Sequence, residues 1–338
     1  DSVSYCFLED SAFEYAAQGL SGQEFLWYEE IRDILASFGE NATLDETGIE
    51  AGLDERDIDR IFQYVLSDHP ELFYVEGYSY TKYTKGDETV SFDFTGTYSV
   101  DAETAEARRK EIGAEAERIL GNIGGDWDDY AKAKAVYETV ILETDYDRNA
   151  PENQNIYSVF VNHRSVCQGY AKATQFLLNR LGVECTLVTG TVETGETHAW
   201  NLVRVDGAYY YLDTTWGDAS YSLDDDTTMA ANRPQINYDY LNVTTQELLR
   251  THTPSDSMEL PLCVDTDANY YVREGAFFSG FDKDQLRTVF EQAKEQGRDE
   301  VALKCSDEEC YRQMLDRLIG GQEIFLYMDT VSGGAVAY

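Results

Sequence analysis

The feature that most restricts the fold is the order of structural signals between residues 164 and 218. A stretch with helical spacing begins at Cys167 and closes at Leu181–Gly182. Three strand-like stretches follow it directly: 184–192, 198–207 and 208–218. The last two are joined by Asp206–Gly207, a dipeptide typical of tight hairpins. A helix followed by antiparallel strands predicts an α+β domain.

The composition indicates a folded and strongly acidic protein. The 338 residues are 13% aromatic, which is ample for packed cores, and the length predicts two or three domains. Acidic residues outnumber basic residues by 64 to 26, so the net charge is −38 and nucleic acid is not an expected partner. No apolar run approaches the roughly 18 residues that a membrane-spanning helix needs.

The start of the chain and its composition suggest a location. The first residue is Asp1 rather than methionine, and the chain is acidic, rich in tyrosine and poor in lysine. We therefore expect an exported bacterial protein whose leader has been removed, located outside the cell or at its surface. The oligomeric state is left open.

The chain divides into three predicted parts. Residues 1–122 carry helical stretches and a hairpin that turns at Lys85–Gly86–Asp87. Residues 123–257 hold a further helix and the helix-and-strand region described above. Residues 258–338 predict a small α/β module with two helices. Its strands are expected at 269–278, 300–305, 323–329 and 334–338. The module has no histidine and no glycine-rich phosphate loop, so no chemistry is assigned to it.

The six cysteines are irregularly spaced and include no Cys-x-x-Cys pair. A chain of this length folds without disulfide staples, so most of them are expected to be free thiols. The pairing that merits a test joins Cys263 to Cys305 or Cys310. With only four histidines, a structural zinc site has few ligands, and we expect no metal and no other cofactor. The acidic stretch 224–228 matches no calcium loop, so a solvated turn is favoured there.

Cys167, His198 and Asp213 form the candidate catalytic group. Cys167 lies at a helix start, where free N–H groups and the helix dipole favour a thiolate, the reactive form of cysteine. His198 and Asp213 lie near the open end of the predicted hairpin, so we expect them to be roughly paired across it. Each residue alone has an ordinary explanation, as core filler, packing residue or turn cap. The three placements together favour a nucleophile, a base and a carboxylate that orients the base.

Three motifs carry a resemblance to a known family. The helix opens with "SVCQGYA", and the strands contain "HAWN" and "DTTW". These motifs, within residues 151–218, resemble the bacterial transglutaminase-like superfamily, a branch of the papain-like fold. The flanking parts are similar in organisation to exported, multidomain Gram-positive members. The resemblance implies a Cys167–His198–Asp213 triad and a cysteine helix packed on an antiparallel sheet.

The other site candidates complete the oxyanion hole or surround the triad. An oxyanion needs two donors. The backbone N–H of Cys167 is one, and the side chain of Gln154 or the hydroxyl of Tyr157 is a candidate for the second. Three aromatic residues are expected to pack around the site, with a substrate-groove wall as the alternative for the tryptophans: Trp200, Trp216 and Tyr170.

Gly169 and the remaining histidines are given structural roles. Gly169 is expected to let the cysteine helix approach the sheet closely. His163 is expected in a surface loop, with a place in the cleft as the alternative. His69 and His252 adjoin helical stretches and are interpreted as structural.

The predicted function is thiol-dependent acyl transfer on protein or cell-wall peptide amides, as in a cysteine peptidase, an amidase or a transglutaminase-like enzyme. Hydrolysis is favoured over crosslinking, because water competes well for the thioester unless the site excludes it. The alternative is a non-catalytic cell-surface binding or scaffold protein that retains the fold. Peptide N-glycanase activity is disfavoured, because the paired Cys-x-x-Cys zinc motifs that usually accompany it are missing.

Overall fold

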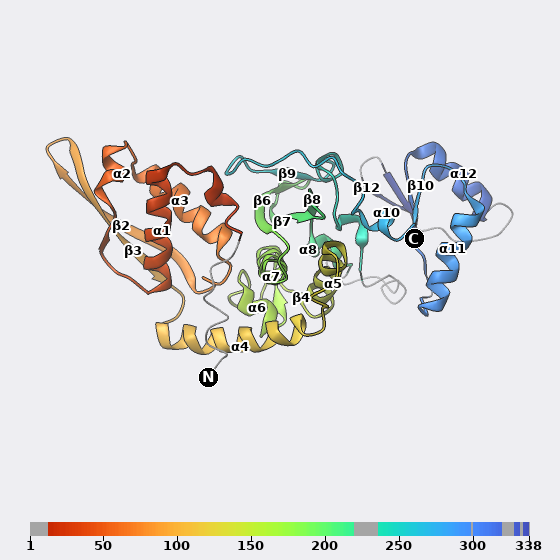
Figure 1. Ribbon diagram of the computed structural model, residues 1–338, viewed down its shortest axis with the longest axis horizontal. Helices are drawn as coiled ribbons and strands as arrows, with labels where there is room; N and C mark the ends of the chain where they lie inside the picture. The colour runs from red at the N-terminus through yellow and green to blue at the C-terminus, as the bar shows by residue number, and fades with distance from the viewer. Residues whose placement is uncertain (1–12, 220–235, 299, 320–327, 332–333, 338) are drawn as a thin grey trace.

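The computed structural model describes residues 13–219, 236–298, 300–319, 328–331 and 334–337. The N-terminal helices and a long hairpin lie at one end of an elongated molecule, and an antiparallel sheet lies in the middle (Figure 1). The C-terminal helices lie at the other end. One hydrophobic cluster extends through all three parts, from Ala17 to Met314. The domain boundaries given above stay predictions.

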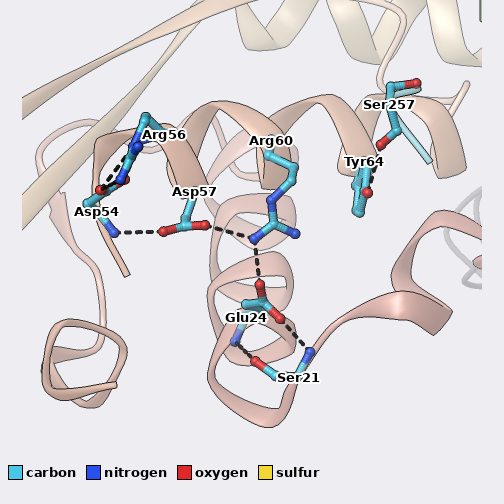
Figure 2. A network of polar contacts seen from close by, with 8 residues as sticks. All are labelled: Ser21, Glu24, Asp54, Arg56, Asp57, Arg60, Tyr64 and Ser257. Atoms are coloured by element: carbon cyan, nitrogen blue, oxygen red, sulfur yellow. Dashed lines mark hydrogen bonds and ion pairs between the residues drawn. The ribbon is translucent and has the colours of Figure 1, made fainter. Parts of the chain in front are cut away.

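Two capped helices organise the N-terminal part: α1 (Gly22–Ala36) and α3 (Glu55–Asp68). Each begins with a capping box, in which the cap residue and an acid three positions later satisfy backbone N–H groups reciprocally. Figure 2 shows that Arg60 pairs with both of these acids, Glu24 and Asp57. The guanidinium therefore ties the first turn of α1 to the first turn of α3.

The predicted hairpin around Gly86 is confirmed. β2 (Val75–Lys85) pairs antiparallel with β3 (Glu88–Tyr98), and the short β1 (Ala42–Thr43) pairs with the other edge of β3. Phe92 and Phe94 alternate along β3 and are fully buried, against Trp27 of α1 and Phe62 of α3 respectively. Two short helices complete this part: η1 (Ala16–Gly19) and α2 (Glu46–Glu50).

A long helix leads to the centre of the molecule. α4 (Ala102–Leu120), capped by Asp101, runs beneath the central elements (Figure 1). Beyond it come α5 (Asp129–Leu142), β4 (Asp145–Tyr146), α6 (Ile156–Phe160) and β5 (Arg164–Ser165). β4 and β5 pair in parallel immediately before the helix that begins at Cys167.

The central sheet is antiparallel, with the order β8-β7-β6-β9. Its strands are β6 (Cys185–Val192), β7 (Thr197–Val205), β8 (Ala208–Leu212) and β9 (His252–Pro254). α7 (Cys167–Arg180) packs on one face, where the carbonyl oxygen of Ala171 accepts a hydrogen bond from the Asn201 side chain at 2.9 Å. The predicted α+β core, a cysteine helix on an antiparallel sheet, is confirmed.

Two short helices after β8 lie on the side of α5 and α7: α8 (Thr214–Gly217), where Thr214 lies beside Thr174 of α7, and η3 (Tyr238–Tyr240), where Tyr238 donates to Glu138 of α5. The chain that comes next, which includes α9 (Thr245–Leu248), covers the opposite face of the sheet. A separate hydrophobic cluster forms there from Val188, Trp200, Leu202, Tyr211, Val243, Leu248 and Cys263. The sheet is therefore shielded on both faces.

In the C-terminal part, the strand expected at 269–278 is wrong. The Asn269 side chain accepts a hydrogen bond from the N–H of Tyr271 and starts the short helix α10 (Tyr270–Arg273). Only β10 (Phe277–Phe278) is extended. A local cap of this kind competes with strand pairing, and alternation of residue types does not reveal it.

The other C-terminal elements follow the predicted order. β10 pairs in parallel with β11 (Lys304–Cys305), which is shorter than the strand expected at 300–305. The two predicted helices are α11 (Lys283–Glu295) and α12 (Glu308–Ile319). β12 (Met328–Val331) and β13 (Gly334–Ala337) form an antiparallel pair. Within the described residues, no helix is both long and apolar enough to cross a bilayer.

The suggested disulfide of Cys263 is also wrong. Cys263 is a free, buried thiol packed into the cluster that covers the sheet. Cys305 and Cys310 are free as well, and their thiols lie beside each other, between β11 and α12. The packing of Cys263 against the sheet explains why it does not bridge to the C-terminal module.

Candidate active site

Cys167 is the first residue of α7 and is partly exposed. Val166 caps the helix and offers no side-chain acceptor, so the N–H groups of the first turn are not satisfied by a cap. The N–H of Val166 donates instead to the carbonyl oxygen of Asn153 at 3.0 Å, which fixes the approach to the helix. The thiol therefore lies where the helix dipole and free N–H groups favour negative charge.

His198 lies near the start of β7 and is buried. Its Nε2 is 2.8 Å from Oδ2 of Asp213. The Cys167 thiol lies beside the same imidazole, close enough to raise the pKa of the ring. Because Asp213 occupies Nε2, the ring nitrogen left for the thiol is Nδ1. The structure thus brings the three candidate residues together in the order thiol, imidazole, carboxylate.

The register of the hairpin differs slightly from the expected pairing. Asn201 is opposite Leu212, so Asp213 follows the last paired residue of β8 and lies diagonally from His198 rather than opposite it. Diagonal neighbours on one face of a sheet are still within reach of long side chains. The predicted proximity is therefore met with an offset of two residues.

Asp213 is almost completely buried, yet it remains ionised. Its Oδ1 accepts the N–H groups of Thr215 and Trp216 at 2.9 and 3.1 Å, which makes it the cap of α8. Burial by itself would raise the pKa of Asp213. The neighbouring His198 charge and the hydrogen bonds from two histidines outweigh burial, so the pKa lies well below its usual range.

The same pairing keeps a proton on His198. Burial would lower the pKa of this imidazole, but the Asp213 carboxylate and the Cys167 thiol raise it to about 10. A protonated imidazole beside the thiol favours the thiolate, the nucleophilic form of cysteine. The site therefore has the electrostatics of a cysteine–histidine nucleophile pair, with a carboxylate that orients the base.

Residues 117–214 match the family model of the Transglutaminase-like superfamily. The matched range contains Cys167, His198 and Asp213, together with α5, α6, α7 and the strands β6, β7 and β8. The chain therefore contains a transglutaminase-like domain, and its fold agrees with this assignment.

Curated relatives and solved structures share only part of the chain. The kyphoscoliosis peptidases of Mus musculus and Homo sapiens are 26% and 25% identical over 105 residues. That alignment covers 26% of this chain and spans 16% of each relative's length. A crystal structure of a transglutaminase is 17% identical and has a TM-score of 0.31, covering 47% of this chain and 50% of its own. A candidate cysteine protease from Cytophaga hutchinsonii is 12% identical and has a TM-score of 0.27, covering 40% and 61%.

A second histidine joins the transglutaminase-like site, and the sequence did not reveal it. His252 was interpreted as structural, yet its Nε2 lies 3.0 Å from the same Oδ2 of Asp213. It comes from β9, beyond the matched range, and its Nδ1 is 2.7 Å from the hydroxyl of Thr251. The alternating residues Thr251 to Pro254 were the one signal of a strand here, and nothing in them indicates pairing with β6.

Aromatic residues enclose the His–Asp pair of the domain. Trp200 is fully buried and stacks on His198, with ring centroids 5.9 Å apart, and Trp216 lies 6.1 Å from the same ring. This arrangement agrees with packing that keeps water away from the pair. Tyr170 is buried one turn beyond Cys167, and its hydroxyl donates to the carbonyl oxygen of Thr144 at 2.7 Å.

The two candidates for a second oxyanion donor have different surroundings. Gln154 is exposed. The carbonyl oxygen of its neighbour Asn153 accepts a hydrogen bond from the N–H of Val166, the residue before Cys167, so Gln154 belongs to the segment next to the thiol. The Tyr157 hydroxyl donates to Glu111 of α4 at 2.8 Å, away from the cysteine helix start. Gln154 is therefore the candidate that we retain.

Three further expectations have structural outcomes. Gly169 faces Ser165 and Ser158 rather than the sheet, because a Cβ there would lie 1.9 Å from Oγ of Ser165. His163 is exposed in a loop, as predicted, and its Nδ1 contacts the carbonyl oxygen of Glu143. His69 is buried between Glu14 and Glu71 in a structural cluster. The acidic stretch 224–228 lies outside the described residues.

The possible metal ligands of the domain coincide with its hydrogen-bonded group. The ligand atoms of His198, Asp213 and His252 lie within 4.8 Å of one another. Both imidazole Nε2 atoms are at hydrogen-bond distance from one carboxylate oxygen, so the cluster is satisfied without an ion. An ion bound there would occupy the nitrogen of His198 that Asp213 uses to orient the base.

Proposed function

We propose that the protein catalyses thiol-dependent acyl transfer on protein or peptide amides, with Cys167 as nucleophile, His198 as base and Asp213 as orienter. The observation that carries the proposal is the continuous contact from the Cys167 thiol through His198 to Asp213 at the start of a helix. The match of residues 117–214 to the Transglutaminase-like superfamily supports it.

The chemistry follows from the geometry. The Cys167 thiolate attacks the amide carbonyl carbon, a C–S bond forms, and negative charge develops on the carbonyl oxygen. The free N–H groups at the start of α7 are suitably placed to stabilise that charge. The His198 imidazolium then donates its proton to the departing amine as the C–N bond breaks. Water or a primary amine attacks the resulting thioester, and the neutral His198 takes the proton from the attacking group. The C–S bond then breaks, which releases the acid or the new amide and restores the Cys167 thiolate beside the His198 imidazolium.

Hydrolysis is the favoured outcome, with protein or cell-wall peptide as substrate. The peptidase names of the mouse and human relatives are in keeping with hydrolysis, although the alignment spans 16% of their length. We also propose an extracellular or cell-surface location, supported by the acidic composition and net charge of −38. Fractionation of the source cells tests the location directly.

Selective alkylation tests the proposal without knowledge of the substrate. Iodoacetamide is expected to label Cys167 much faster than Cys185, since burial and the nearby Glu184 raise the pKa of Cys185 well above its usual range. His198→Ala should suppress the labelling of Cys167 and leave Cys185 unchanged. Labelling of Cys167 no faster than that of Cys185 would favour the non-catalytic scaffold alternative. A library of glutamine-containing and D-amino-acid peptides then defines the substrate, with Cys167→Ala as the inactive control.

A further inference from the structure

We propose that His252 is a positioning residue of this active site, which acts on the base indirectly by holding Asp213. The inference rests on the proposed function, because it assigns a role within the same catalytic group. The structure contains a continuous chain of contacts from Thr251 through His252 and Asp213 to His198 and Cys167.

The carboxylate of Asp213 is held at four points. Oδ1 accepts the backbone N–H groups of Thr215 and Trp216, and Oδ2 faces the Nε2 atoms of His198 and His252. An ionised carboxylate can only accept hydrogen bonds, so both imidazoles donate to it through Nε2. Loss of the donor at residue 252 would leave Oδ2 held by His198 alone, the residue that it must orient.

The other nitrogen of His252 has a partner that suits this role. A ring that donates through Nε2 can accept at Nδ1, and the Thr251 hydroxyl lies 2.7 Å from that atom. A neutral His252 then satisfies both of its ring nitrogens while it donates to Asp213. The hydroxyl of Thr251 in turn lies 3.5 Å from the hydroxyl of Tyr240.

The packing around His252 leaves the ring little freedom to turn. The side chain is fully buried, and ring centroids of Trp216, Trp200 and Tyr240 lie 4.7, 4.9 and 5.6 Å away. A histidine that only filled space would not need an aligned partner at each ring nitrogen. An imidazole enclosed by rings and bonded at both nitrogens is a pre-organised donor.

The backbone brings β9 into place for this contact. His252 pairs with Val192 at the edge of β6, and Gly190 of the same strand is opposite both His198 and Pro254. A Cβ at Gly190 would lie 2.2 Å from the carbonyl oxygen of Thr253, so a side chain there would force β9 away. The glycine therefore allows the close approach that puts His252 within reach of Asp213.

The rate of Cys167 alkylation by iodoacetamide, measured in the full chain, tests the proposal. His252→Phe keeps an aromatic ring but removes the donor, and about a 10-fold slower reaction is expected, the scale known for partners that orient ligand histidines. His252→Gln returns an N–H donor and should restore the rate to within about 3-fold of wild type. Tyr211→Phe is the matched control, because it removes a buried hydroxyl from the cluster on the same sheet, which includes neither Asp213 nor His252, and it should react at the wild-type rate.

A double mutant separates positioning from general destabilisation. If His252 acts through Asp213, His252→Phe should add no further loss in an Asp213→Ala background, whereas independent effects would multiply. A double mutant whose rate loss is the product of the two single losses would overturn the inference. A His252→Gln variant as slow as His252→Phe would overturn it as well. Turnover of peptides that fails while this alkylation pattern holds would refute acyl transfer and leave the positioning role intact.

A spectroscopic measurement covers the case in which Cys167 proves unreactive. Imidazole nitrogen-15 NMR of the wild-type protein should show His252 protonated at Nε2 and unprotonated at Nδ1. Asp213→Ala should abolish this preference, because the acceptor that selects the tautomer is gone. A His252 that carries its proton on Nδ1 in the wild type would contradict the proposed contact, whatever the reactivity of the thiol.

Discussion

Replacing Asp213 by asparagine tests the proposed catalytic arrangement most directly. The substitution is nearly isosteric, and the amide oxygen can keep the two backbone hydrogen bonds that Oδ1 makes with Thr215 and Trp216. The amide NH₂ then faces the Nε2 atoms of His198 and His252, which must accept instead of donate. The proton of a neutral His198 is thereby forced onto Nδ1, the nitrogen that faces Cys167, and the ring cannot accept the thiol proton.

The expected effects on activity and stability differ in size. A tautomer reversed in this way lowers the turnover of triad enzymes by about 10⁴-fold, and we expect alkylation or turnover at Cys167 to fall by about 10³–10⁴-fold. The free energy of unfolding should fall by only about 1–3 kcal/mol, because residue 213 keeps four hydrogen bonds and these change from charge-assisted to neutral. Asp213→Ala leaves four buried donors unpaired and should cost about 4 kcal/mol or more, since each lost partner costs about 1–3 kcal/mol.

The assay combines urea unfolding with the rate constant for carbamidomethylation of Cys167, followed by peptide mapping. Asp68→Asn is the matched control, because Asp68 is also a buried aspartate that accepts two backbone N–H groups, and its partners are Ala16 and Ala17 rather than His198 or His252. An Asp213→Asn variant that reacts within about 10-fold of wild type would show that His198 is not oriented by Asp213. The reasoning from the tautomer would then be refuted.

Three further predictions concern pH, packing and metals. Burial would lower the pKa of His69, but Glu14 and Glu71 raise it to about 10. The protonated His69 therefore stabilises the folded protein fully below about pH 6.5, and this stabilisation is lost as pH rises to 10. The free energy of unfolding should fall over that range, and His69→Gln should flatten the decline. Gly169→Ala should destabilise the protein by about 1–3 kcal/mol in urea unfolding, because the new methyl group collides with Ser165 Oγ. EDTA should leave the alkylation rate of Cys167 unchanged; a loss on chelation would mean that His198, Asp213 and His252 hold an ion.

The sequence predicted the parts of the site that have local signals. Cys167 is at the first residue of α7 because the preceding backbone is extended, and the Asp206–Gly207 turn joins β7 to β8 as expected. The offset between His198 and Asp213 was not predicted, because hairpin register depends on how both strands pack and not on the turn alone. The local rules gave the right neighbours and left the exact pairing undetermined.

Contacts between distant segments account for what was missed. His252 reaches Asp213 because β9 pairs with β6 across a long stretch of intervening chain, and no periodicity within either strand specifies that pairing. The Tyr157 hydroxyl meets Glu111 because α4 runs beneath α6, a placement that depends on tertiary packing. The cap at Asn269 converted an expected strand into a helical turn for a local reason that competes with alternation.

The position of β9 has a consequence for how the protein is made. During synthesis, α7 and the strands β6 to β8 leave the ribosome well before His252, and until then the free edge of β6 has no partner. Exposed strand edges invite pairing with other chains, so a truncated fragment that stops near residue 214 should be prone to aggregation. A fragment meant to fold on its own should therefore extend through Cys263, whose segment completes the cover over the sheet.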